Sequence, residues 1–156
     1  MRKLKLYLET SIFNFAFAED SLSEREATLR LLAELGRYDV YISDVVLGEI
    51  LETQDEEKRQ QLLDLIKQHR PQELHFDEQA RILAEKYLQE GVIPRRYQED
   101  AFHIAIASVH NLDVLISWNF SHIVKLKTKR EIVGINVLMG YQAMEICSPW
   151  EVIENE

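Results

Sequence analysis

The sequence predicts an α/β protein of three layers (α/β/α), in which helices cover both faces of a mainly parallel five-stranded sheet. Short apolar runs typical of strands alternate along the chain with segments of helical spacing. Residues 113–118 (DVLISW) form a nearly continuous apolar run, which is typical of a central parallel strand. Residues 99–110 (EDAFHIAIASVH) are apolar nearly all round, which indicates a helix buried in the middle of the fold.

Five strands are expected, each a short apolar run bounded by turn signals. The first alternates polar and apolar side chains and places Leu4, Leu6 and Leu8 on one face of the sheet. The predicted strands are residues 3–8, 38–43, 73–76, 113–118 and 134–140.

The segments between the strands carry the spacing and the end signals of helices. Ser43 or Asp44 can cap the helix that follows the second strand. Asp77 can cap the helix after the third strand, and Gly91 can end it. The predicted helices lie near residues 11–18, 23–36, 45–53, 55–70, 77–90 and 99–110, and residues 121–130 are expected to form a basic loop.

The length and the composition fit one globular domain, residues 1–156. Apolar residues make up 46% of the chain and charged residues 29%, which excludes wholesale disorder. Cys147 is the only cysteine, so an intrachain disulfide is excluded and a reducing compartment is favoured. The apolar runs are too short for a transmembrane helix or a signal peptide, so we expect a cytoplasmic protein with no membrane partner.

The formal net charge of −9 argues against generic affinity for nucleic acid. Cations nevertheless gather in two places, and such clusters can contact a polyanion even in an acidic protein. A solvated loop is the simpler interpretation of the larger cluster. The cations concerned are the pair Arg95 and Arg96, and Lys125, Lys127, Lys129 and Arg130 in the basic run.

Polar side chains follow the predicted strands at the edge where parallel strands end. Ligands of open α/β sheets bind in the crevice beyond this edge. The residues concerned are Glu9, Thr10 and Ser11 after the first strand, Glu49 on the helix after the second, Asp100 at the start of the buried helix, and Ser117 and Asn119 after the fourth strand.

Each of the main candidates also has a simpler explanation. Glu9 can be a strand end that faces solvent, and Glu49 an exposed acid on an amphipathic helix. Asp100 can complement the helix dipole, and Asn119 can be a turn residue. We favour the joint functional interpretation because four independent coincidences would otherwise fall on one edge of one sheet.

Carboxylates gathered in this way predict a site for a hard divalent cation. Mg²⁺ and Mn²⁺ prefer oxygen ligands, and Mg²⁺ usually keeps several waters beside a few carboxylates. Carboxylates about 5 Å apart repel one another by about 3 kcal/mol per pair at an effective dielectric constant near 20. The cluster therefore needs a cation or a bound proton. A cation here could activate a water for attack on a phosphodiester.

Four segments follow one another along the chain: LYLETSIFNFAF (6–17), SDVVLGEI (43–50), EDAFHIAIA (99–107) and LISWNFSHI (115–123). Together they resemble the PIN domain family, especially toxin-like ribonucleases of the VapC type. The resemblance implies a PIN-like α/β/α fold, often a homodimer, with an acidic site that binds Mg²⁺ or Mn²⁺ and cleaves RNA. For a toxin of this type it also implies a small antitoxin protein as a partner.

The resemblance places the family's four metal-site positions on Glu9, Glu49, Asp100 and Asn119. Glu9 and Asn119 stand where the family usually has aspartate. Glutamate keeps the charge and adds one methylene group, whereas asparagine keeps an oxygen and loses the charge. The supporting hydroxyl positions fall on Thr10 or Ser11, and on Ser117.

The predicted function is a divalent-metal-dependent endoribonuclease, with the four metal-site residues as its catalytic residues and the two basic clusters as RNA contacts. Two alternatives stay open. One is a catalytically weak or inert PIN-like module that binds RNA or a protein partner. The other is a metal-dependent hydrolase of small phosphate esters.

Three further side chains near this edge are given structural roles. His103 is interpreted as a core residue, although it lies close enough to Asp100 to contact it. His122 is expected on an exposed loop. Trp118 is expected to pack beneath the turn after the fourth strand rather than to stack on a base.

Overall fold

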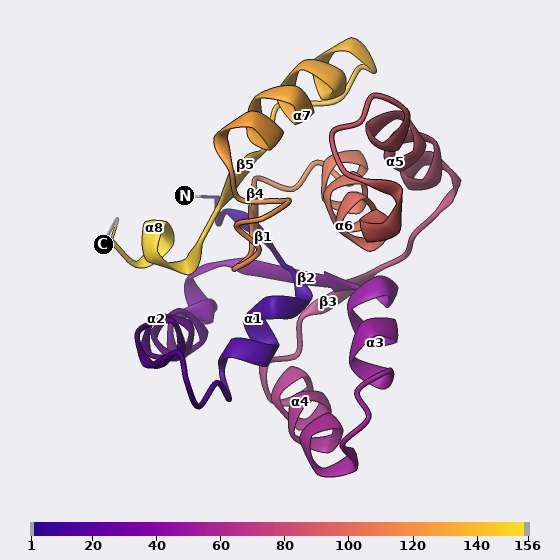
Figure 1. The fold of residues 1–156 in the computed structure, drawn as a ribbon. Coiled ribbons are helices and arrows are strands. Elements are labelled where there is room, and N and C mark those ends of the chain that lie inside the picture. The colour runs from indigo at the N-terminus through magenta and orange to yellow at the C-terminus, as the bar shows by residue number, and fades with distance from the viewer. Residues whose placement is uncertain (1, 155–156) are drawn as a thin grey trace.

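The computed structural model describes residues 2–154 and shows a five-stranded sheet between two layers of helices (Figure 1). The strands are β1 (Lys5–Leu8), β2 (Asp39–Ser43), β3 (Gln72–Leu74), β4 (Val114–Ile116) and β5 (Glu145–Cys147). The α-helices are α1 (Thr10–Phe15), α2 (Leu22–Ala33), α3 (Asp44–Leu51), α4 (Glu56–His69), α5 (Glu78–Gln89), α6 (Gln98–Val109), α7 (Leu126–Leu138) and α8 (Pro149–Glu154). Two short 3₁₀ helices are η1 (Leu35–Arg37) and η2 (Arg95–Tyr97).

The sheet is parallel throughout, in the order β3-β2-β1-β4-β5, which confirms the predicted fold class. In Figure 1, α1, α2 and α4 lie on one side of the sheet, and α5, α6 and α7 on the other. Because both faces are covered, Leu6, Tyr7 and Leu8 of β1 are all buried, whichever face they point to.

The strand order reverses direction beside β1. The chain moves from β1 to β2 and β3 on one side, and later to β4 and β5 on the other side. Such a reversal opens a crevice at the carboxyl ends of the two strands that flank it. Here these strands are β1 and β4, which stay joined past their ends because the Glu9 N–H donates to the Ile116 carbonyl (3.1 Å).

The predicted fifth strand, residues 134–140, was wrong, and the predicted loop at residues 121–130 was right only for residues 121–125, because α7 begins at Leu126. These segments supply most of α7, and the fifth strand is β5. The buried residues of α7 are Thr128, Ile132 and Asn136. In a strand Arg130 and Gly134 would share their face, but both are exposed, so the burial follows the helical period and not the strand period. A short apolar run does not distinguish a strand from a half-buried helix by its pattern alone.

The predicted caps explain where two helices begin. The Ser43 hydroxyl accepts hydrogen bonds from the N–H groups of Val45 and Val46 at the start of α3. Asp77 accepts one from Ala80 at the start of α5 (2.9 Å). None of the helices in residues 2–154 is long and apolar enough to cross a membrane.

Candidate metal centre

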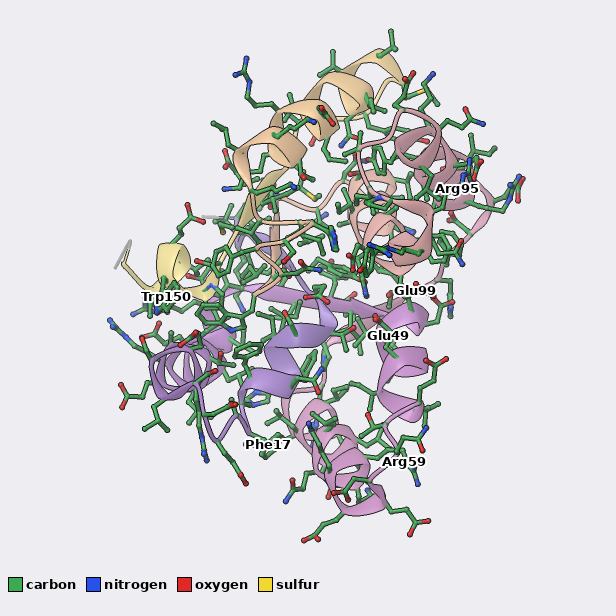
Figure 2. The ribbon with its side chains drawn as sticks, in the orientation of Figure 1. Phe17, Glu49, Arg59, Arg95, Glu99 and Trp150 are labelled. Carbon is green, nitrogen blue, oxygen red and sulfur yellow. The ribbon has the colours of Figure 1, made fainter. Side chains whose placement is uncertain are left out.

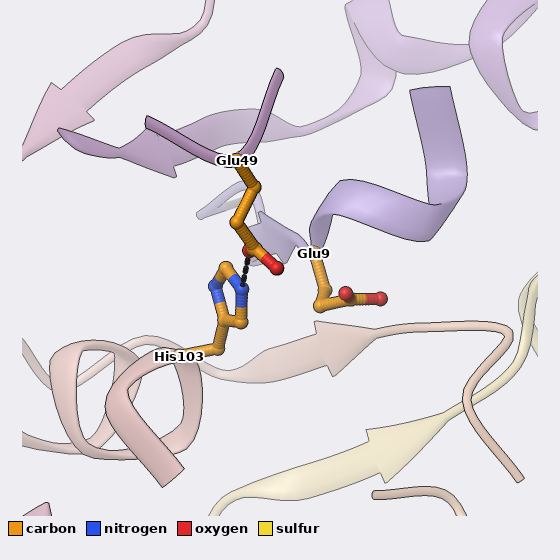
Figure 3. Close-up of side chains that lie close together, drawn as sticks. All are labelled: Glu9, Glu49 and His103. Atoms are coloured by element: carbon orange, nitrogen blue, oxygen red, sulfur yellow. Dashed lines mark hydrogen bonds and ion pairs between the residues drawn. The ribbon is translucent and has the colours of Figure 1, made fainter. Parts of the chain in front are cut away.

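Glu9, Glu49 and Asp100 come from three different parts of the fold near the carboxyl edge of the sheet, and Asp100 senses the charge of Glu9 without belonging to the tightest cluster of ligand atoms. Glu9 follows β1, Glu49 lies in α3, and Asp100 lies in the first turn of α6. Glu9, Glu49 and His103 offer ligand atoms that all lie within 4.8 Å of one another (Figure 3). Figure 2 shows Glu49 and Glu99 where α3 and α6 approach each other, and Arg95 farther out.

Glu9 is only 5% exposed, and one of its two oxygens accepts hydrogen bonds from three donors. Its Oε1 accepts from the Ser11 N–H (3.2 Å), the Ser11 hydroxyl (2.6 Å) and the Ser117 hydroxyl (2.6 Å). The two hydroxyls accept in turn from the N–H groups of Trp118 and Asn119, so they fix the turn after β4. The other oxygen, Oε2, accepts no hydrogen bond within residues 2–154.

Glu49 shows the same division between its two oxygens. Its Oε1 accepts from the Thr10 hydroxyl (2.7 Å) and lies 2.5 Å from Nε2 of His103. Burial favours a raised pKa for this carboxyl, but the hydrogen bond and the charge of His103, together with the Thr10 hydroxyl, bring its pKa below the usual value. The side chain is 33% exposed, so a ligand can reach it from solvent.

Asp100 is the third carboxylate with one held oxygen. Its Oδ2 accepts from the side-chain amide of Asn119 (3.2 Å) and lies 3.2 Å from Nδ1 of His122. Burial, followed by the negative charge of Glu9, raises the pKa of Asp100 to about 6. In the metal-free protein this carboxyl therefore carries an unfavourable charge at neutral pH.

This raised pKa predicts how stability depends on pH in the metal-free protein. The folded pKa of Asp100 lies above the ordinary value of 3.8 for an aspartate, so the folded state binds the proton more tightly, and stability falls as pH rises from about 4 to about 6. Asp100→Asn removes this loss. The variant should therefore gain melting temperature relative to the parent between pH 4 and pH 7, both measured in EDTA. A constant difference over this range would contradict the shift.

His103 is the member of the site that sequence reasoning missed. It is fully buried, as expected of a core residue, but Nδ1 lies 2.6 Å from the Tyr7 hydroxyl, which lies 2.7 Å from Oγ of Ser43. Burial favours a lower pKa for His103, but Glu49, Glu9 and Asp100 raise it above its usual value. The available signal was a histidine in a helix that is apolar nearly all round, since a buried imidazole needs hydrogen-bond partners.

The cations predicted to contact RNA lie at the surface. Arg95 is paired with Glu85 (2.6 Å), whereas Arg96 lies over the ring of Tyr97, 5.0 Å from its centroid. The Tyr97 ring packs against His122 with centroids 4.1 Å apart and a tilt of 31°, and His122 in turn contacts Asp100. Those of α7 lie on its first turns or at its N-cap: Lys125, Lys127 and Arg130 are exposed, and Lys129 is half-buried.

The turn after β4 differs in one detail from its prediction. Trp118 is buried beneath it as expected, donating its indole N–H to Thr28 (2.7 Å). His122 is half-buried rather than exposed, because its ring is held between Tyr97 and Asp100.

The donor set fits a hard divalent cation. Three carboxylates each have one oxygen held by protein donors and a second oxygen that accepts no hydrogen bond from the described residues. The fixed oxygens restrict rotation, so the second oxygens are oriented before a ligand arrives. A few carboxylate oxygens with room for water are the surroundings that Mg²⁺ and Mn²⁺ prefer.

The fold and the site define an α/β protein with a cluster of acidic side chains near the reversal of its sheet. Residues 6–119 match the model of the PIN domain. The chain belongs to the PIN domain family, whose members are typically nucleases that depend on a divalent metal. A search of curated proteins finds no match.

Three solved structures have a similar fold. A VapBC2 complex from Rickettsia felis bound to a promoter DNA fragment has a TM-score of 0.61 at 19% identity, over 93% of this chain and 98% of that chain. A toxin–antitoxin complex from Klebsiella pneumoniae has a TM-score of 0.56 at 17% identity, over 79% and 93%. VapBC-5 from Mycobacterium tuberculosis has a TM-score of 0.51 at 19% identity, over 92% and 98%. At these identities the likeness shows the fold.

Proposed function

We propose that this protein is a Mg²⁺- or Mn²⁺-dependent endoribonuclease of the VapC type. The observation that carries the proposal is the set of three carboxylates, Glu9, Glu49 and Asp100, near the carboxyl edge of the sheet, each with one oxygen held by protein donors and one that accepts no hydrogen bond from the described residues. Glu9, Glu49 and Asp100 would hold the ion, which would supply an activated water and stabilise the negative charge that develops on the attacked phosphodiester.

The residues around the carboxylates orient them. Ser11 and Ser117 hold Glu9 through the same oxygen. Thr10 and His103 hold Glu49. The groups that hold Asp100 are Asn119 and His122.

Asn119 holds Asp100 without adding a charge. Its amide nitrogen donates to Asp100, and its amide oxygen accepts from the His122 N–H (3.0 Å). We propose that Asn119 also positions a water or a weaker second ion.

Asn119→Asp should therefore tighten Mn²⁺ binding and destabilise the metal-free protein. The change replaces the donor beside Asp100 with a second carboxylate, which repels it until a cation is bound. Calorimetric titration with Mn²⁺ and thermal melts in EDTA check the two effects. Unchanged Mn²⁺ affinity would remove Asn119 from the site.

The substrate and the partners follow from the same assignment. We propose that Arg96 and the cations of α7 contact the RNA backbone, because their positive charges attract phosphate groups, which the acidic cluster would repel in the absence of a cation. The solved structures with this fold include complexes of toxin and antitoxin. We propose by analogy a small antitoxin that blocks the site, and a cytoplasmic homodimer.

Mn²⁺ should raise the melting temperature of the protein. A ligand that binds only the folded state at 100 times its Kd stabilises it by about 2.7 kcal/mol, which corresponds to about 5–10 °C for a domain of this size. A melting temperature that Mn²⁺ leaves unchanged would favour the alternative of a catalytically inert PIN-like module that binds RNA or a protein partner. Comparison of RNA with an aryl phosphate as substrate separates the nuclease from a hydrolase of small phosphate esters.

A further inference from the structure

His103 occupies a position where it could serve either as a metal ligand or as a support for Glu49. Its Nε2 belongs to the cluster of ligand atoms within 4.8 Å of one another. Its two ring nitrogens, however, are both engaged: Nδ1 with the Tyr7 hydroxyl at 2.6 Å, and Nε2 with Glu49 Oε1 at 2.5 Å. As a ligand, Nε2 would have to abandon the carboxylate.

We propose that His103 is a positioning residue, which selects the oxygen of Glu49 that faces the ion and does not bind the metal itself. It acts at the end of a buried hydrogen-bonded chain, the His103 network, formed by Ser43, Tyr7 and His103. The inference rests on the proposed metal centre, and it assigns a role to three residues outside the predicted ligand set.

The His103 network is shielded from solvent along its whole length. Ser43, Tyr7 and His103 are each 0% exposed. Hydrogen bonds in such surroundings do not compete with water, so they hold the imidazole in one orientation. The T-shaped contact of the Tyr7 and His103 rings, with centroids 5.7 Å apart, further limits rotation of the imidazole.

The network ties α3 to the site at two points. Ser43 caps the first turn of α3, and Glu49 lies farther along the same helix. The chain from Ser43 through Tyr7 and His103 to Glu49 therefore closes a ring that includes β1, α3 and α6. Displacement of α3 relative to β1 would break this ring.

The consequence for Glu49 is a distinction between its two oxygens. Oε1 accepts from both Thr10 and His103, whereas Oε2 accepts no hydrogen bond from residues 2–154. In Figure 3 one oxygen of Glu49 faces His103, and the other is directed toward the side of Glu9. His103 and Thr10 together thus leave Oε2 as the oxygen available to an ion.

The test compares Mn²⁺ affinity in Tyr7→Phe, His103→Gln and His103→Leu with that of the parent. Loss of an outer hydrogen-bond partner typically costs 10–100-fold in metal affinity. We expect His103→Leu to weaken binding by at least about tenfold. Tyr7→Phe should weaken it by a smaller factor, and His103→Gln should restore part of the loss because its amide can donate to Glu49.

Tyr87→Phe is the matched control. Tyr87 is also a buried tyrosine whose hydroxyl is hydrogen-bonded, to Ser108 in the last turn of α6 and to Asn136 of α7, neither of which contacts the carboxylates. This variant should lose stability as Tyr7→Phe does, yet keep the parent's Mn²⁺ affinity. Equal Mn²⁺ affinity in Tyr7→Phe and the parent would overturn the role of the network.

Spin-echo EPR of bound Mn²⁺ distinguishes positioning from ligation. A coordinated imidazole gives the ion a direct ¹⁴N coupling, and we expect none in the parent. A ¹⁴N coupling that disappears in His103→Gln would show that His103 is a ligand and overturn the inference.

Failure of the metal centre itself gives a different result. If the parent binds no Mn²⁺, the proposed function fails, and the network still makes a prediction for the metal-free protein. NMR should show slowly exchanging imidazole N–H protons of His103 that shift in Glu49→Gln and in Tyr7→Phe. Rapid exchange of these protons would overturn the network.

Discussion

Asp100→Asn is expected to lower the rate of RNA cleavage by at least about 100-fold, the upper end of what loss of a supporting group costs a metal site. The substitution removes one of three negative charges that hold the ion and leaves the size of the side chain unchanged. Its amide oxygen can still accept from Asn119, so the turn after β4 should keep its structure. Initial rates with a labelled RNA at saturating Mn²⁺ measure the effect.

The melting temperature of Asp100→Asn shows whether the variant is still folded. Because burial and Glu9 raise the pKa of Asp100 to about 6, neutralising this residue should not lower the melting temperature at neutral pH without metal. A variant that is stable and inactive supports the assignment. Cleavage at the parent's rate would show that Asp100 does not hold the catalytic ion.

Glu9→Ala is expected to abolish detectable Mn²⁺ binding and to lower the free energy of unfolding by about 2 kcal/mol. Three donors lose their acceptor, two of them hydroxyls at the carboxyl edge of the sheet, and a buried donor without a partner costs about 1–3 kcal/mol. Calorimetric titration and urea unfolding measure the two losses separately.

Glu9→Gln separates the two contributions of Glu9. Glutamine keeps an oxygen that can accept from Ser11 and Ser117, so most of the stability should remain, but the charge is lost. We expect weak Mn²⁺ binding in a folded protein. Mn²⁺ affinity equal to that of the parent would exclude Glu9 as a ligand and leave it a structural cap of α1.

The sequence predicted the sheet up to β4 because each of those strands has a distinctive pattern. The alternation of Leu4, Leu6 and Leu8 marks β1, and the apolar run at residues 113–118 marks β4. Residues 134–140 contain enough Ile, Val and Leu to resemble a strand, which placed the predicted fifth strand largely within α7 rather than at β5 (Glu145–Cys147). Pairing with β4, rather than local preference, decides where the fifth strand forms.

The predicted acids depended only on where strands and helices end, which the sequence marks well. The orientation of their oxygens depended on contacts between residues far apart in the chain. Ser117 reaches Glu9 across 108 positions, and His103 reaches Glu49 across 54. Such pairs carry no local signal, so the second oxygen of each carboxylate could be recognised only from the fold.

The most direct test of the central claim is cleavage of an unstructured RNA by the purified protein in Mn²⁺ and in EDTA, beside an identically prepared Asp100→Asn sample. The account predicts cleavage by the parent in Mn²⁺, none in EDTA, and almost none by the variant in either condition. Cleavage that persists in EDTA, or that is equal in the two samples, would contradict a metal-dependent nuclease built on these carboxylates.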